Sequence, residues 1–231
     1  MLKDIQVTLY DIFGYLLPGF IFLTGIAILF WAIFIPSTPI QLLTISGDIW
    51  IVILLSTYII GHMVQAIANL LTKQLQSAEN TVLSKGQADS FPDTVIDSAT
   101  SKVNLILGVK MKDMKPGFLY QVCDEAVAQF GVTSDRDIYI YREGFYRGLT
   151  VSFMTLFLGL TARVLVPGAS LNISGNLQPI NISMLLFFDV IFLILARLSF
   201  NRYKRFGSYR VKEAVIGFLL LWHNKISSEN K

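Results

Sequence analysis

Two stretches without a charged residue decide the fold: IFGYLLPGFIFLTGIAILFWAIFI at residues 12–35 and IWIVILLSTYIIGHMVQAIANLL at residues 49–71. A helix needs roughly 20 apolar residues to cross a hydrocarbon core of about 30 Å, and both stretches exceed that length. Two further apolar runs lie at 148–166 and 180–196, interrupted only by Arg163 and Asp189 respectively. The fourth run is long enough only if its helix continues to Phe200. The sequence therefore predicts four transmembrane helices.

The composition argues against a soluble protein. Of 231 residues, 53% are hydrophobic and only 15% are charged, whereas soluble domains carry about 25% charged residues. A soluble chain of this length could not enclose four such helices in its own core. We therefore expect an all-α integral membrane protein.

Lysine and arginine indicate the orientation, because they accumulate in cytoplasmic loops. The links at 36–48 and 167–182 contain neither residue, whereas the segment at 73–147 contains nine and the segment at 197–231 contains eight. We expect both termini and the central segment to be cytoplasmic (N-in/C-in). The layout is a first transmembrane hairpin (1–72), a helical cytoplasmic insertion (73–147), a second hairpin (148–200) and a basic cytoplasmic tail (201–231).

The insertion shows two short helical patterns. The first, at 94–107, has apolar residues on one side at Val95, Ala99, Val103 and Ile106. The second, at 119–130, has them at Leu119, Val122, Ala126 and Phe130. Ser134 resembles a helix N-cap, and its helix is expected to run into the third span. Short helices bury little alone, so the insertion should pack on the spans, on the tail or on another subunit. The apolar residues 214–222 are too few to span, and should lie on the membrane surface or against the insertion.

The first span contains a helix-breaking group, Gly14, Pro18 and Gly19. Proline removes a backbone donor and clashes with the preceding turn, so a kink is expected near Gly14. Transmembrane helices often tolerate such residues, so the kink is either a packing feature or a hinge or pore-lining bend.

The second span contains a polar group, His62, Gln65 and Asn69, whose spacing places all three on one helical face. Polar groups are costly against lipid, so this face should look at protein or water. Interhelical hydrogen bonding is the favoured reading, and an aqueous path is the alternative. One histidine with two amides is a poor metal site.

Arg163 and Asp189 are the ionisable residues inside the last two apolar runs. At 1.5 Å per residue, Arg163 lies about 22 Å up the third helix and Asp189 about 10 Å down the fourth. Those depths nearly coincide in a core of about 30 Å, so an intramembrane ion pair is expected. The alternative is a gating or pore-facing charge.

A basic cluster follows the fourth span. It lies beside the inner leaflet, where each cation gains about 1 kcal/mol from anionic lipid, so lipid binding is expected. A phosphorylated, nucleotide or nucleic-acid ligand is the less favoured alternative. The cluster consists of Arg197, Arg202, Lys204, Arg205, Arg210 and Lys212.

Enzyme signatures are missing from the sequence. It has no phosphate-binding loop, no His-Glu-x-x-His and no nucleophile elbow, and its single cysteine, Cys123, reads as a packed small residue. We therefore expect a non-enzymatic protein that needs no cofactor and no metal.

The pairing of GYLLPG (14–19) with YIIGHMVQ (58–65) resembles a family of small bacterial inner-membrane proteins with a Pro-Gly first span and a Gly-His-x-x-Gln second span. Some relatives look like membrane components of anti-phage defence systems. The resemblance covers about the first 70 residues. It implies a homo-oligomeric, channel-like or membrane-perturbing effector in the bacterial inner membrane that responds to a cytoplasmic signal. A membrane scaffold for a soluble protein partner is the alternative, and a small ion or solute transporter is the third.

Overall fold

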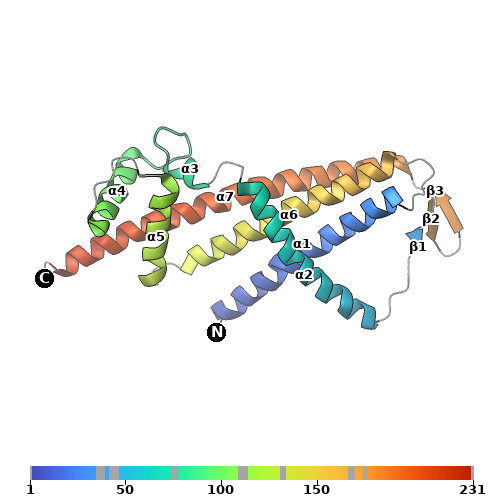
Figure 1. Cartoon of the computed structure of the whole chain (residues 1–231), viewed down its shortest axis with the longest axis horizontal. Helices are drawn as coiled ribbons and strands as arrows, with labels where there is room; N and C mark the ends of the chain where they lie inside the picture. Colours follow the sequence, from blue (N-terminus) through green and yellow to red (C-terminus); the bar gives the residue numbers. More distant parts are fainter. Residues whose placement is uncertain are drawn as a thin grey trace. The chain divides into compact units, whose positions relative to one another are not determined.

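The computed structural model describes residues 2–34, 40–41, 47–73, 78–108, 114–130, 134–165, 170–173, 176–179 and 181–229. Nearly all of them are helical. Figure 1 labels the helices α1 (Leu2–Phe34), α2 (Gly47–Lys73), α3 (Ala78–Leu83), α4 (Asp93–Leu107), α5 (Pro116–Phe130), α6 (Ser134–Leu165) and α7 (Ile182–Glu229).

Four of these helices are long and apolar enough to cross a membrane, as predicted. The candidate spans are Ile12–Phe34 in α1, Gly47–Thr72 in α2, Arg136–Leu165 in α6 and Ile182–Asn224 in α7. The last two helices exceed the apolar runs that revealed them, because no proline lies within 134–165 or 182–229 to end them. The expected helix from Ser134 into the third span is confirmed.

Three short strands accompany the helices, which the sequence reading did not anticipate. They are β1 (Ile40–Gln41), β2 (Ser170–Ile173) and β3 (Asn176–Pro179). Strand β2 pairs in parallel with β1 and antiparallel with β3. Strands of two to four residues are too short to show an alternating pattern in the sequence.

The described chain forms two compact units. Unit 1 comprises Met1–Leu70 and Gly144–Tyr203, and unit 2 comprises Leu71–Glu143 and Lys204–Lys231. The two units meet at 70/71, 143/144 and 203/204. Each of these positions lies within a few residues of the predicted segment boundaries at 72/73, 147/148 and 200/201. The insertion and the basic tail belong to the same unit, so the tail is one packing partner of the insertion.

Glycines bring the helices of unit 1 together. A methyl group on Gly61 of α2 would lie 2.6 Å from the carbonyl carbon of Tyr15 in α1, and one on Gly19 would lie 2.8 Å from the Gly61 nitrogen. The same relation joins α1 to α6, where a methyl group on Gly25 would lie 2.7 Å from the Leu156 nitrogen. Real side chains do not approach so closely, so the backbone contacts require glycine.

Helices α6 and α7 contact each other at three levels in unit 1. Their contacts join Arg147 to Tyr203, Phe153 to Phe192 and Thr161 to Asp189. Residue numbers rise along one helix as they fall along the other, so the contacts are antiparallel. The pairing of the spans as two membrane hairpins and the cytoplasmic placement of both ends stay predictions.

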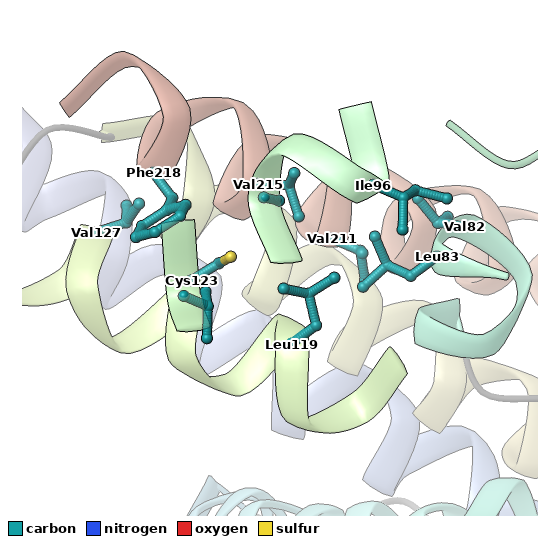
Figure 2. Close-up of a cluster of buried hydrophobic side chains, with 11 residues drawn as sticks. Val82, Leu83, Ile96, Leu119, Cys123, Val127, Val211, Val215 and Phe218 are labelled. Carbon is teal, nitrogen blue, oxygen red and sulfur yellow. The ribbon is translucent and has the colours of Figure 1, made fainter. Parts of the chain in front are cut away.

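Unit 2 has its own hydrophobic core, in which α3, α4, α5 and α7 converge (Figure 2). Helix α7 contributes Val211, Val215 and Phe218, so the apolar residues 214–222 pack against the insertion. The predicted phases of the two insertion helices are partly wrong. Helix α4 buries Ile96 with Ala99 and Val103, and α5 buries Leu119 with Cys123 and Val127. Ile106 and Phe130 are exposed.

Candidate functional site

The Gln65 side chain of α2 bridges α1 and α6. Pro18 has no N–H, so the carbonyl oxygen of Gly14, four residues earlier in α1, lacks its usual helical donor. Gln65 Nε2 donates to that Gly14 oxygen at 3.4 Å and to the Gly144 oxygen of α6 at 2.9 Å. Helix α1 is continuous through Pro18. The predicted bend near Gly14 stays a prediction, but the carbonyl that Pro18 leaves without its helical donor is bound to another helix.

A second polar contact ties α1 to α6. The Ser152 hydroxyl donates to the Pro18 carbonyl oxygen at 2.7 Å and also lies 3.0 Å from the Gly148 oxygen. Pro18 and Ser152 are fully buried. Sequence reasoning missed Ser152, because a lone serine in an apolar run carries no signal about its partner.

The Gln65 amide is only partly satisfied. Its two acceptors are carbonyls, so the nitrogen must face them and Oε1 must point elsewhere. Oε1 is buried and has no hydrogen-bond partner among the residues that the structure describes. A buried polar atom without a hydrogen-bond partner lowers the stability of the fold by about 1–3 kcal/mol.

The structure separates the three polar residues of α2. Gln65 reaches into the helix packing, whereas His62 and Asn69 are exposed. At about 100° per residue, Gln65 lies about 60° around the helix from His62, and its long side chain reaches the neighbouring helices. The His62 ring stacks on Tyr15 at 3.8 Å between centroids and meets the edge of Tyr58 at 4.9 Å. The three residues therefore differ in their surroundings, and a shared polar strip stays a prediction.

Arg163 and Asp189 are both buried in unit 1, and each has a contact of its own. The Arg163 guanidinium carbon lies 3.6 Å from the centroid of the Trp31 ring, a cation–π contact with α1. Asp189 Oδ2 accepts a hydrogen bond from the Thr161 hydroxyl at 2.8 Å, and Oδ1 has no partner in the described part of the chain. The ion pair between Arg163 and Asp189 stays a prediction.

Arg210 is the centre of a partly buried network in unit 2. Its guanidinium contacts Glu143 of α6 at 2.6 Å and Glu79 of α3 at 2.9 Å, and also donates to the Tyr120 hydroxyl of α5. Burial raises the pKa of Tyr120 to about 12 despite the nearby guanidinium, so the phenol stays protonated. Arg210 was expected in the lipid- or ligand-binding cluster. It instead holds three helices against α7, and the sequence did not point to its partners.

Four of the other members of the basic cluster are exposed. Lys212 is half-buried, and the Arg205 Nε donates to the Tyr209 hydroxyl at 2.7 Å. Anionic lipid or ligand binding by this set stays a prediction. The exposed members are Arg197, Arg202, Lys204 and Arg205.

The described residues contain no group of three or more His, Cys, Asp or Glu side chains that could hold a metal ion. Comparison of the chain with known protein families, curated proteins and solved structures found no match.

Proposed function

We propose that the chain is a multi-pass protein of the bacterial inner membrane that changes membrane permeability in anti-phage defence. Its spans pair as two hairpins, both ends are cytoplasmic, and unit 2 receives a cytoplasmic signal to which unit 1 responds. The distribution of lysine and arginine supports this orientation, because the links between paired spans contain none. The mechanism requires no enzymatic chemistry and no cofactor.

The observation that carries the proposal is the incomplete hydrogen bonding inside unit 1. Gln65 Oε1 and Asp189 Oδ1 are buried, and neither has a partner among the described residues. An inert membrane anchor gains nothing from such groups, and intramembrane ionisable residues usually mark ion or substrate pathways. A second conformation that admits water would satisfy both atoms, so we infer that unit 1 opens an aqueous path.

The hydrogen bond from Gln65 to Gly14 joins α2 to α1, and these are the two helices that would separate when the path opens. The Gly14 carbonyl cannot recover a helical donor, because residue 18 is proline. If Gln65 withdraws from α1, water is the replacement donor at this depth. Separation of α2 from α1 therefore favours entry of water at Gly14.

Membrane potential in cells that express the chain, measured before and after phage infection, tests the proposal. The wild-type chain is expected to depolarise the membrane and admit an impermeant dye. Gln65→Leu removes the hydrogen bond that holds α2 to the Gly14 carbonyl, so before infection it should depolarise the membrane more than the wild type does, at an unchanged amount of inserted protein. The matched control is Met63→Leu, an exposed position two residues away. A wild-type chain that leaves the potential intact under both induction and infection contradicts the proposal.

A scaffold function is the second candidate, and exposed apolar residues of unit 2 favour it. Leu105 and Phe130 are each 70% exposed, and Ile106 is 51% exposed. A soluble partner could bury these residues. A partner bound to unit 2, with the membrane potential unchanged in every condition, would select this function.

A further inference from the structure

Helix α2 has a buried face with a regular spacing. Thr57, Gly61, Val64 and Ala68 are spaced by four, three and four residues and are buried in unit 1. A spacing that alternates between three and four places side chains along one seam of a helix, and such seams pack against other helices. Here Gly61 meets the backbone of α1 at Tyr15.

The opposite face of α2 repeats this spacing but is exposed. We name it the α2 seam, and its residues are spaced by three, four, three, four and three positions. The aliphatic members of its first half are each 62% exposed. At about 100° per residue, its centre lies roughly 160° from the centre of the buried face. The α2 seam consists of Val52, Leu55, Ile59, His62, Ala66 and Asn69.

The α2 seam carries two polar side chains within the candidate span Gly47–Thr72. Lipid tails cannot hydrogen-bond, so an exposed histidine and asparagine are unfavourable there and favour contact with another polar group. Tyr15 of α1 and Tyr58 of α2 contact the His62 ring. Ala66 lies between the two polar residues and leaves room for a close helix approach.

We propose that the α2 seam binds the α2 seam of a second copy of this chain, as a parallel pair of helices with a left-handed crossing. Two copies inserted with the same topology place identical residues at identical depths. Asn69 of one copy then faces Asn69 of the other copy. A carboxamide both donates and accepts hydrogen bonds, so the two side chains can bond to each other. A polar residue at a seam position also fixes the register of a helix pair. The inference rests on the proposed membrane insertion and deepens the proposed function, because it names the partner.

Disulfide cross-linking in native membranes tests the contact with single cysteine substitutions. Ala66→Cys lies on the α2 seam, and Ile67→Cys lies about 100° away at nearly the same depth. Wild type is the blank, since Cys123 is fully buried. We expect oxidation to yield dimers of Ala66→Cys at least about tenfold above those of Ile67→Cys. Equal yields, or an adduct whose mass differs from two copies, would overturn the proposal.

Association of differently labelled copies in detergent provides the second measurement. Asn69→Leu should weaken association about three- to thirty-fold, because one interhelical hydrogen-bonded pair is lost. Leucine is as apolar as lipid, so this variant does not fail by exposing a polar group to the membrane. Leu71→Ala, at an exposed position away from the seam, should leave association unchanged. Unchanged association of Asn69→Leu contradicts the proposal.

The two proposals fail separately. Depolarisation by the wild-type chain without seam cross-linking would overturn the α2 contact and leave the effector function standing. Seam cross-linking without depolarisation in any condition would support the contact and contradict the effector function.

Discussion

Gln65 of α2 donates to the Gly14 carbonyl oxygen of α1, the acceptor that Pro18 leaves without a helical donor. The same nitrogen donates to Gly144 of α6, so one amide joins three helices. Pro18 and Gln65 are far apart in sequence but act on the same carbonyl. Pro18 leaves the Gly14 oxygen of α1 without a helical donor, and Gln65 of α2 binds that oxygen.

Removal of Pro18 should therefore make Gln65 partly redundant. In Pro18→Ala, the new N–H can donate to Gly14, so the added variant Gln65→Leu loses less stability than it does in the wild type. We expect a coupling free energy of about 1 kcal/mol in a double-mutant cycle, measured by unfolding in detergent. Additive free energies would show that the Gly14 bond contributes nothing.

Gly14 and Gly19 of the first span should tolerate alanine very differently. Gly19→Ala forces a methyl group against the backbone of Thr57 and Gly61, and we expect a loss of about 3 kcal/mol or failure to assemble. Gly14→Ala meets no atom within 4 Å and should be neutral or slightly stabilising. Thermal unfolding of both variants in the same detergent measures the contrast. Similar melting temperatures would contradict the close approach of α1 and α2.

The Arg210 network should contribute strongly to the stability of unit 2. Glu143→Gln leaves a largely buried guanidinium short of one of its two carboxylates, and we expect a loss of about 3 kcal/mol. Hydrogen exchange in α3 and α5 is the measurement, because both helices contact Arg210. The control is Lys85→Met, which breaks the exposed ion pair with Asp97 and should change stability by less than about 0.5 kcal/mol. Equal protection in the two variants would contradict the network.

The Cys123 thiol should be inert in the folded protein. Burial raises its pKa to about 12, so the reactive thiolate is scarce below that pH. At pH 8 we expect alkylation at least about a thousand-fold slower than that of an exposed thiol, with a rate that still rises with pH at pH 10, because the thiol is mostly protonated there. Phe130→Cys, at an exposed position, supplies the fast-reacting comparison. Rapid labelling of the wild-type chain under native conditions would contradict the buried position of Cys123.

The sequence by itself determined the four candidate spans, because a long apolar run without charge leaves few soluble alternatives. It also located α4 and α5 of the insertion but missed α3, and it did not show which residue of each pair of neighbours points inward. Periodicity gives the phase of a helix only to within one residue, and Ile96 and Cys123 were missed for that reason.

Only the tertiary structure decided what each polar residue contacts. Gln65 was grouped with His62 and Asn69 by spacing, yet it donates hydrogen bonds to both α1 and α6, whereas the His62 ring stacks on Tyr15 of α1. Arg210 was grouped with the exposed cations, yet it lies between two glutamates. Spacing along one helix fixes the direction of a side chain but not the identity of the neighbour it meets. That neighbour depends on which backbones can approach, and glycines remote in sequence decide it.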